Sequence, residues 1–348
     1  MSSRWTNDDE ISATVESVGL SNGVRAGQSD DVRFAQNVRD IVAGFVADAP
    51  LARPVVFLLL GPDEDPPAGA EYKPRIHKGE VDLAGGIWTV RAAAVSGHGT
   101  PIPGDASEEI FEAVCGALGL GDAPAMYCDT NVNPPVLAWY PEGLGTPDVL
   151  FEGPLGADID PTLGDVIEIV DRVHRFKLMT SRNQKPGTTL WQDPDKHWAH
   201  EHAEKRAQEA LMLGLDTQWP RPFFAEEEIR SDTGRYDIAF KKVLSPGVVE
   251  TRAILELKVT RSRGHNGGPY ADGRNAANTV MGVEQAKGYA LDHGTRDAAC
   301  LIFDLRTDEH HSPPDAAVAR GAELDVAVHW WRCFPTSEDY RDIQLANL

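Results

Sequence analysis

The clearest pattern of hydrophobic and polar residues lies between 235 and 259, where two alternating stretches flank a Ser-Pro-Gly turn at 245–247. Alternation with a period of two is typical of a strand that has one buried face, and Pro-Gly marks a turn. This segment therefore predicts a β-hairpin, with one strand before the turn and one strand after it.

The alternation also assigns the polar residues of the hairpin to faces. In the first strand the large apolar side chains lie opposite Asp237, because successive side chains of a strand point to opposite faces. These apolar residues are Tyr236, Ile238 and Phe240. In the second strand Glu256 and Lys258 share one face, beside the strand that offers Asp237. Three charged side chains are thus predicted to meet in an otherwise apolar hairpin.

Carboxylates and an ammonium in apolar surroundings are costly to desolvate unless something compensates their charges. A divalent cation does so, and Mg²⁺ takes a few carboxylate oxygens while it keeps several waters. A water made more acidic by the metal and held by Lys258 would be a nucleophile for a phosphodiester. The alternative is an ordinary ion pair between Glu256 and Lys258 on the strand surface, because a Glu-x-Lys sequence also arises by chance.

A helical pattern precedes the hairpin. Apolar residues between 196 and 214 recur at helical spacing, with Gly214 as the expected end of the helix. On the helical wheel Glu204 falls at the margin of the buried stripe, whereas Glu201 lies about 60° away towards the polar side. A carboxylate at the buried margin needs a partner, which is either the charged cluster of the hairpin or a neighbouring Arg or Lys.

Further elements follow from pattern and composition on both sides of the hairpin. A strand is predicted at 223–232, and the glycine content of 261–275 predicts a loop. After that loop the chain is predicted to form a helix at 278–291 and strands at 298–306 and 324–334. Gln285 and Tyr289 are four residues apart and therefore share one face of that helix.

The order helix, strand, acid-bearing strand, Glu-x-Lys strand, helix and strand over residues 196–306 resembles the core of the PD-(D/E)xK nuclease superfamily. Asp237 matches the lone acid of that family, and Glu256-Leu257-Lys258 matches its ExK motif. The resemblance implies the restriction-endonuclease-like fold, an α/β architecture in which helices flank a mixed sheet.

Tyr236 stands where the family's name has a proline, which is a departure from the motif. A Gln-x-x-x-Tyr helix after the ExK strand recurs in one nuclease branch of the superfamily, and members often add a glutamate from the helix before the sheet. By resemblance, the metal ligands would be Asp237, Glu256, Glu204 and the carbonyl of Leu257, with Lys258 and Gln285 as further catalytic residues. Lys258 would orient the attacking water and offset charge. The implied cofactor is Mg²⁺, for which Mn²⁺ would substitute.

The first half of the chain alternates strands and helices and carries no P-loop and no GxGxxG after a strand. Helices are predicted at 30–49, 107–118 and 162–178, and strands at 54–61, 87–95, 125–127, 136–140 and 148–153. We therefore expect a separate α/β domain of unknown role at 1–180. A Pro- and Gly-rich linker at 181–195 would join it to a nuclease-like domain at 196–348.

The formal charge of −21 at pH 7 is the main objection to a nucleic-acid enzyme, because phosphate binding draws on Lys and Arg. Basic residues nevertheless gather next to the predicted site in the sequence. The expected nucleic-acid contacts are Arg261, Arg263 and Arg274 around the glycine-rich loop, and Lys185 at the end of a basic stretch that begins at Arg172. The alternative for both stretches is a solvated surface.

The four cysteines lie far apart without a CxxC pair, which indicates reduced thiols rather than a zinc ribbon or a disulfide framework. No apolar run has the length needed to cross a bilayer, and the N-terminal residues are polar and acidic. These features predict a cytoplasmic protein that does not enter a membrane.

The sequence therefore predicts a Mg²⁺-dependent nuclease, with DNA cut internally as the expected reaction and restriction, phage defence or repair as the expected setting. Two alternatives remain open. One is a nuclease-like fold that only binds nucleic acid or a protein, which loss of an acid or of the lysine would reveal. The other is a ligand-sensing protein whose nuclease domain is an effector. A homodimer, and a protein or small-molecule partner for residues 1–180, also stay open.

Overall fold

The computed structural model describes residues 30–48, 51, 53–74, 76, 83, 86–94, 96–101, 107–146, 149–155, 160–184, 188–219, 222–227, 230–231, 234–245, 248–307 and 314–346. Contacts within the chain divide it into two compact units, Met1–Ile159 (unit 1) and Asp160–Leu348 (unit 2). In the described ranges no helix combines the length and the apolar character that a membrane crossing requires.

Unit 1 is built on a seven-stranded mixed sheet in the order β2-β4-β3-β1-β5-β6-β7. Strand β1 is parallel to β3, and the other neighbours are antiparallel. The strands are β1 (Val55–Leu59), β2 (Glu71–Lys73), β3 (Gly86–Val90), β4 (Gly97–Pro101), β5 (Ala125–Asp129), β6 (Val136–Tyr140) and β7 (Phe151–Pro154). The helices are α2 (Asp30–Asp48) and α3 (Ser107–Glu112), which a π-helical turn, η2 (Ala113–Ala117), continues.

Helices cover both faces of the unit 1 sheet because its central strand is apolar on both faces and is buried throughout. Helix α2 packs on one face, where the ring of Phe34 lies 5.5 Å from the ring of Trp139. Helix α3 and η2 bring Ile110 and Val114 onto the other face, against Val56. The short strands β2 and β4 were not predicted, because they are polar or glycine-rich and lack an apolar alternation.

Unit 2 is built on a five-stranded mixed sheet in the order β10-β13-β14-β15-β16. Strands β10, β13 and β14 are antiparallel to one another, whereas β14, β15 and β16 run parallel. These strands are β10 (Phe223–Glu227), β13 (Ile238–Ser245), β14 (Val248–Arg261), β15 (Asp297–Leu305) and β16 (Ala327–Arg332). Two small sheets pair β8 (Trp191–Asp193) with β9 (Trp198–Ala199), and β11 (Arg230–Ser231) with β12 (Gly234–Arg235).

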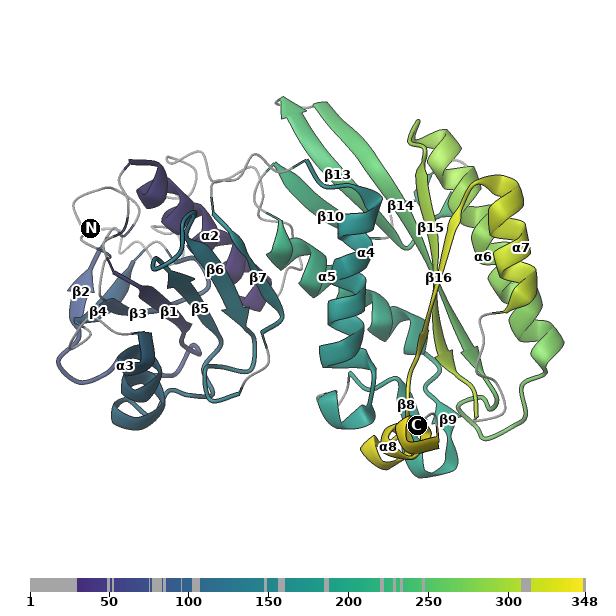
Figure 1. Ribbon diagram of the computed structural model, residues 1–348, viewed down its shortest axis with the longest axis horizontal. Helices are drawn as coiled ribbons and strands as arrows, with labels where there is room; N and C mark the ends of the chain where they lie inside the picture. The colour runs from purple at the N-terminus through teal and green to yellow at the C-terminus, as the bar shows by residue number, and fades with distance from the viewer. Residues whose placement is uncertain are drawn as a thin grey trace, which may run out of the picture. The chain divides into compact units, whose positions relative to one another are not determined.

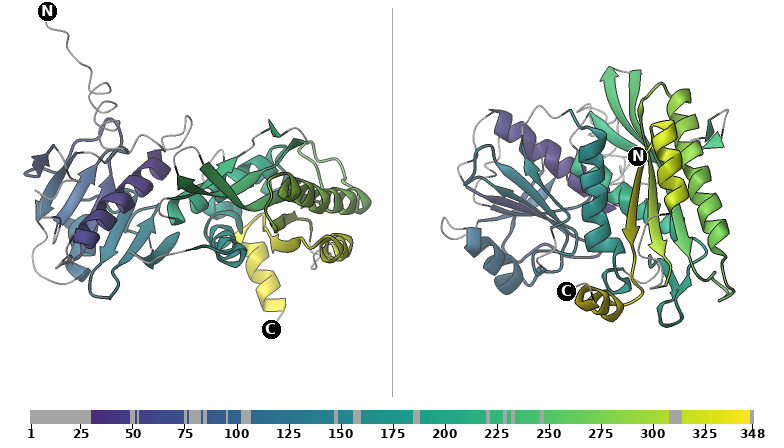
Figure 2. Two further views of the ribbon diagram at one scale, coloured as in Figure 1. Left: turned by 90° about the horizontal axis from the view of Figure 1, so that it is seen from above. Right: turned by 45° about the vertical axis from the view of Figure 1, so that its right-hand side comes forward.

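The helices of unit 2 form a layer on each face of this sheet (Figure 1). They are α4 (Leu163–Val173), α5 (Ala203–Gln218), α6 (Asp272–Asp292), α7 (Asp315–Leu324) and α8 (Ser337–Ala346), with short turns η3 (His174–Leu178), η4 (Ser181–Asn183) and η5 (Pro194–Lys196). Helices α6 and α7 lie side by side on one face, and α4 and α5 lie on the other (Figures 1 and 2). The sheet that carries the Glu-x-Lys strand is therefore buried on both faces, and β14 is buried from Ala253 to Thr260.

The predicted hairpin is present, since β13 and β14 pair from Ile238 opposite Leu255 to Ser245 opposite Val248. The predicted alternation is wrong at its first residue, because β13 begins only at Ile238. Tyr236 packs in the core on the α6 side, together with Ala239, rather than on the face of Ile238 and Phe240. Asp237 therefore lies just before the strand, and the alternation of side chains along β13 does not determine which way it points.

Helix α5 begins later and ends later than the sequence predicts. Residues 191–199 form the small β8–β9 sheet, and Asp193 caps the turn η5 by accepting a hydrogen bond from the backbone N–H of Lys196 at 3.3 Å. The predicted helix end at Gly214 is also wrong. A Cβ at this position would lie 2.3 Å from Cγ2 of Val173, so the glycine lets α4 and α5 approach closely.

The boundary between the two units falls between residues 159 and 160, earlier than the 181–195 segment that the sequence favours. Helix α4 packs against α5 and so belongs to unit 2. Thr162 begins this helix with a capping box, in which its backbone N–H donates to Asp165 at 2.7 Å. The expected linker at 181–195 also falls within unit 2, where it contributes η4 and β8.

Candidate functional site: a charged cluster at the splayed edge of β14

The site forms where β13 stops pairing with β14. Strand β13 begins at Ile238, opposite Leu255, whereas β14 continues to Arg261 alongside β15. Beyond Leu255, the backbone groups of β14 that point towards β13 have no strand partner among the described residues of β13. Buried backbone N–H groups need acceptors, so side chains must supply them here.

One carboxylate supplies such an acceptor, and a second lies close to the edge. The backbone N–H of Leu257 donates to Oδ2 of Asp237 at 2.7 Å. The carboxylate of Glu204, in the first turn of α5, faces the backbone of Val259 at the same edge. The open strand edge therefore has one acid bound to it from the loop before β13, and a second acid from α5 lies beside it.

Glu256 and Lys258 lie side by side on β14, with Nζ of Lys258 2.7 Å from Oε1 of Glu256. Glu256 is 2% exposed and Lys258 is 8% exposed, so this is a buried pair rather than a surface pair. The second carboxylate oxygen of Glu256, Oε2, is buried and accepts no hydrogen bond from the described residues. A buried carboxylate oxygen without a donor is costly, and it leaves one coordination position open for a ligand.

Helix α6 packs directly onto this pair through Gly282. A Cβ at Gly282 would lie 2.7 Å from Cγ and 2.9 Å from Cε of Lys258, and 3.1 Å from Sγ of Cys300. Any larger residue would have to displace the aliphatic part of Lys258. Glycine in the interior of a helix is unfavourable, and close packing on Lys258 accounts for it here.

The charged groups change one another's pKa. Burial, together with the negative charge of Asp237, raises the pKa of Glu256 from 4.5 to about 8, although Lys258 opposes this. Burial likewise raises the pKa of Glu204, which Asp237 raises further and Lys258 lowers. Burial disfavours the charged form of Lys258, but Glu256, Glu204 and Asp237 together raise its pKa above the ordinary value. The cluster therefore holds one firmly charged ammonium among carboxyl groups that compete for it.

Gln208 is a site residue for which the sequence analysis assigned no role. It is buried, and its Nε2 donates to the backbone carbonyl of Asp237 at 2.5 Å. Lys205 in turn donates to Oε1 of Gln208 at 3.3 Å. Gln208 lies four residues after Glu204 on α5, so helical spacing was the signal that could have indicated a shared face. Its hydrogen bond fixes the main chain at the acid before β13.

The structure separates the two candidate glutamates of α5. Glu201 lies before the helix with its side chain 53% exposed, 3.4 Å from Nε2 of His202. Glu204 instead faces Lys258, Asp237 and Val259. The helix stripe predicted this difference, although the helix begins later than expected.

Gln285 lies on α6, three residues after Gly282, and its Oε1 is buried without a hydrogen-bond donor among the described residues. It is therefore on the helix face near the cluster, but the structure shows no hydrogen bond between Gln285 and the charged residues. Tyr289, one turn further on, packs its ring 6.0 Å from the ring of Tyr236. Lys185 lies outside the described residues.

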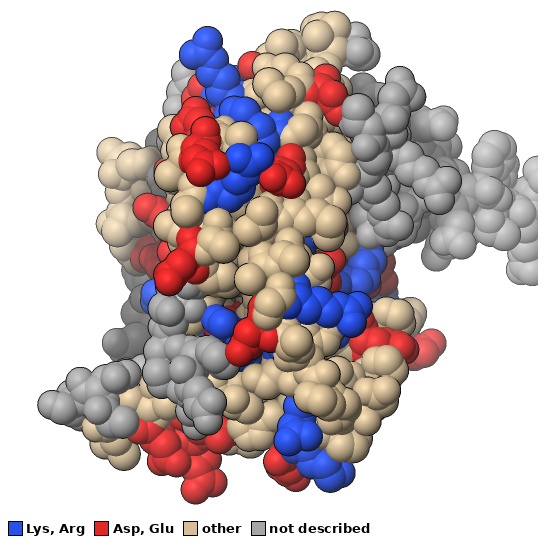
Figure 3. Space-filling model, turned by 90° about the vertical axis from the view of Figure 1, so that its right-hand side faces the viewer, with Lys and Arg blue, Asp and Glu red and all other residues tan. Residues whose placement is uncertain are grey.

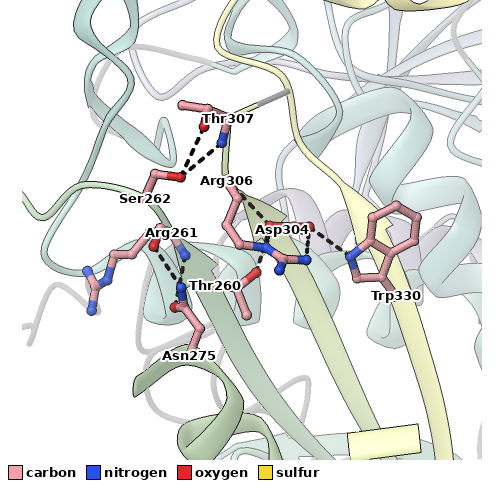
Figure 4. Close-up of polar contacts among 8 residues, drawn as sticks. All are labelled: Thr260, Arg261, Ser262, Asn275, Asp304, Arg306, Thr307 and Trp330. Carbon is pink, nitrogen blue, oxygen red and sulfur yellow. Dashed lines mark hydrogen bonds and ion pairs between the residues drawn. The ribbon is translucent and has the colours of Figure 1, made fainter. Parts of the chain in front are cut away.

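The carboxyl ends of β14 and β15 carry a second acid that is fully engaged (Figure 4). Asp304 is buried and accepts hydrogen bonds from Thr260 Oγ1 at 2.7 Å and from Trp330 Nε1 at 3.0 Å. The guanidinium of Arg306 binds the same carboxylate through Nε and Nη2, at 2.8 and 2.7 Å. Asp304 therefore has a structural role, in contrast to Glu256, which keeps one oxygen unused.

The donor set of the cluster suits a hard divalent cation, although it is not a complete preformed site. Among the described residues no three His, Cys, Asp or Glu side chains converge as a metal-binding group. Mg²⁺ needs only one or two carboxylates, because waters and substrate phosphates complete its coordination. Glu256 Oε2 and Asp237 are the acids placed to hold it. The carbonyl of Leu257 points to the same strand edge as its N–H, because both groups of one strand residue face the same side.

The chemistry of this cluster is thus a set of hard oxygen donors beside an ammonium, at one end of a buried sheet. Such a set binds a cation and an anion next to each other. Comparisons of the chain with protein-family models, with curated proteins and with solved structures found no match.

Proposed function

We propose that unit 2 is a metal-dependent phosphodiesterase that cuts nucleic acid, with DNA cut internally as the expected reaction. The observation that carries the proposal is the buried Glu256–Lys258 pair, in which Oε2 of Glu256 accepts no hydrogen bond from any described residue. This pair lies near Asp237 and Glu204. The order α5, β10, β13, β14, α6 and β15 also agrees with the order that the PD-(D/E)xK resemblance implies.

The alternatives of an ordinary ion pair and of a non-cutting nuclease-like fold fit these observations less well. A structural ion pair gains from having both carboxylate oxygens bound, as in the Asp304–Arg306 pair. Here Oε2 of Glu256 is buried and has no donor in the described part of the chain, and two further acids lie close by. Such a cluster of buried charges lowers the free energy of unfolding. Proteins usually carry unfavourable clusters of this kind at functional sites, where the charged groups take part in binding or catalysis.

The cluster divides the work of phosphodiester hydrolysis among its residues. Asp237 and Glu256 would hold Mg²⁺ or Mn²⁺, with Glu204 and the Leu257 carbonyl in support. When bound, the ion supplies a Lewis acid for a phosphate oxygen and makes a neighbouring water more acidic. Lys258, whose raised pKa keeps it protonated, donates hydrogen bonds to the attacking water and to the phosphoryl oxygens, which offsets the negative charge that develops there.

Gln208 and Gly282 would position these groups rather than touch the substrate. Gln208 holds the main chain at Asp237, and Gly282 leaves room for the extended side chain of Lys258. Burial by α5 and α6 excludes water from the Glu256–Lys258 pair, which strengthens each electrostatic contact.

A cleavage assay on the full chain tests the proposal. Supercoiled DNA, linear DNA and RNA are incubated with the protein in Mg²⁺, in Mn²⁺ and in EDTA. We expect cleavage that requires a metal and falls at least about 100-fold in Lys258→Ala, because one preorganised donor contributes about that much. Lys258→Met keeps an unbranched side chain of similar length without the charge and should lose the same activity.

Lys287→Ala on α6 is the matched control, and it should cleave like the wild type. Circular dichroism and metal-induced stabilisation of Lys258→Ala establish that the fold and the metal ligands survive. Cleavage by Lys258→Ala at the wild-type rate under single-turnover conditions would show that the mechanism is wrong. Absence of cleavage by the wild type on every substrate in both metals would reject the function.

A further inference from the structure

Tyr270 gathers two arginines at the end of β14. The guanidinium carbon of Arg261 lies 4.9 Å from the centre of the Tyr270 ring, and that of Arg274 lies 4.7 Å from it. Attraction between a guanidinium and an aromatic ring at such distances holds a flexible arginine in place. The hydroxyl of Tyr270 accepts a hydrogen bond from Nδ2 of Asn278 at 3.2 Å, which ties the ring to α6.

The main chain of Arg261 is fixed as firmly as its side chain. Asn275 is buried, and its amide binds both backbone groups of Arg261: Oδ1 accepts from the N–H at 3.1 Å, and Nδ2 donates to the carbonyl at 2.9 Å. This side chain thus replaces a neighbouring strand at the end of β14. The guanidinium of Arg261 extends away from this contact, beyond the end of the strand (Figure 4).

Arg261 and Arg274 differ from several basic residues of unit 2 that form ion pairs. Arg306 pairs with Asp304, Arg320 pairs with Glu284 and Glu323, and Lys242 and Arg252 share Asp160. On the face that carries α6 and α7, basic and acidic side chains are accordingly interspersed (Figure 3). In the described part of the chain, Arg261 and Arg274 form no ion pair with any carboxylate, although the net charge is −21.

Arg261 also carries an unused donor. Its Nε–H is buried and has no acceptor among the described residues. A buried donor of a charged group without an acceptor is unfavourable, and an anionic ligand with several acceptor oxygens removes that penalty. A phosphate group matches this need, because guanidinium groups bind phosphate oxygens in a two-pronged manner.

Arg261 lies on the strand that carries the proposed reaction centre. Arg261 follows Lys258 by three residues on β14, which is about 10 Å along the strand. Burial raises the pKa of Glu204, and the positive charge of Arg261 acts on this carboxyl group in the opposite direction. A phosphate bound at Arg261 and Arg274 would therefore belong to the same strand as the phosphate at Lys258, a short distance away.

Arg263 does not share this arrangement. Its Nη1 donates to the backbone carbonyl of Gly267 at 3.2 Å, so it stabilises the glycine-rich loop. The sequence suggested the same role for Arg261, Arg263 and Arg274, and the structure separates them. Arg263 thus provides a control of equal charge in the same loop.

We infer that Arg261 and Arg274, held by Tyr270 and Asn275, form an anchor for a second phosphate group of the nucleic-acid strand that is being cut. This inference rests on the proposed function for the identity of the strand. The anchored phosphate is either a phosphodiester within the strand or a terminal monophosphate, since both offer the same oxygens. Tyr270 is a positioning residue that orders the two guanidiniums before the strand binds.

Equilibrium binding tests the anchor separately from cleavage. Fluorescence anisotropy of labelled duplex and single-stranded DNA is measured against salt concentration, on the full chain, in EDTA and in Ca²⁺. For duplex DNA we expect the magnitude of the slope of log K against log salt to fall by about 0.9 in the Arg261→Ala, Arg274→Ala double variant, because the two arginines share one phosphate and each phosphate contact contributes about 0.9. Arg263→Ala should keep the wild-type slope.

Variants of Tyr270 test its role. Tyr270→Phe keeps the ring and should bind as the wild type does, whereas Tyr270→Leu should weaken binding at least about 5-fold by releasing both guanidiniums. Circular DNA, and linear DNA with a 5′-phosphate or a 5′-hydroxyl, distinguish the two sources of the phosphate. If the double variant loses affinity only for DNA with a 5′-phosphate, the anchored group is a terminal monophosphate. If it loses the same affinity for circular DNA, the anchored group is a phosphodiester.

An unchanged slope in the double variant, or an equal decrease in Arg263→Ala, would overturn the inference, as would absence of binding by the wild type in both EDTA and Ca²⁺. Normal anchor-dependent binding without cleavage in Mg²⁺ or Mn²⁺ would instead count against the proposed function alone. Cleavage that survives in the double variant with unchanged KM and salt dependence would count against the anchor alone.

Discussion

Replacing Glu256 by Gln should make the metal-free protein more stable at high pH, although it should also abolish activity. The side chain of Glu256 is 2% exposed, and its Oε2 accepts no hydrogen bond from the described residues. Burial and the charge of Asp237 raise the pKa of Glu256 to about 8. Glutamine has nearly the same volume and cannot ionise, so it removes the cost of a buried negative charge.

The sign and size of the effect follow from the pKa. In the folded protein Glu256 binds its proton more tightly than in the unfolded chain, so the free energy of unfolding decreases as the pH rises from 4.5 to about 8. That interval is about 3.5 pH units, which corresponds to at most about 5 kcal/mol. Lys258 retains Asp237 and Glu204 as partners in Glu256→Gln, so the variant does not strand an unpaired ammonium.

The expected gain over the wild type is therefore small at about pH 5 and about 2–5 kcal/mol at about pH 8. Urea unfolding of the full chain in EDTA, followed by circular dichroism at both pH values, measures it. Glu209→Gln on the exposed side of α5 is the matched control and should show no such dependence. Mg²⁺ or Mn²⁺ should stabilise the wild type and not Glu256→Gln, because the ion takes the place of the proton on Glu256. A variant that is less stable than the wild type by the same amount at both pH values would refute this reasoning.

Two further substitutions test the positions of the charged groups. Gly282→Ala places a Cβ 2.7 Å from Cγ of Lys258 and should lower single-turnover cleavage at least about 10-fold. Gly288→Ala on the same helix is the control, because its Cβ meets no atom of the described residues within 4 Å. It should leave cleavage unchanged and stabilise the helix by about 0.5–1 kcal/mol. Glu204→Gln should raise the Mn²⁺ concentration needed for half-maximal cleavage, while Glu201→Gln, at an exposed position, should not; equal midpoints for the two variants would remove Glu204 from the site.

The sequence predicted Glu256, Lys258 and Glu204 because each of them lies in a strongly patterned element, whereas Asp237 lies just before β13. The period of two in β14 placed Glu256 and Lys258 on one face, where the structure shows them 2.7 Å apart. The helical stripe distinguished Glu204 from Glu201, even though α5 starts at Ala203. The hydrophobic period within an element is a local property of the chain. It therefore assigns residues to the correct face even where the predicted ends of the element are wrong.

Features that depend on contacts between distant segments could not be predicted in this way. Gly214 reads as a helix end in the sequence, but its missing side chain serves the contact with Val173. Tyr236 does not lie on the face that the alternation predicts, because its ring packs against the ring of His293, with 5.2 Å between ring centres. The different contacts of Arg261 and Arg263 likewise depend on which groups lie nearby after folding.

The end of β13 at Ile238 explains why these residues meet at all. If β13 extended further back along β14, its backbone would bind the N–H of Leu257, and Asp237 would be one more residue of a regular strand. Because the pairing stops there, the N–H of Leu257 binds the carboxylate of Asp237, and the carboxylate of Glu204 has room to face the same edge. Asp237 is therefore held by the backbone of the strand that carries Lys258. Any substitution that extends the pairing of β13 should separate the cluster without changing one of its charged residues.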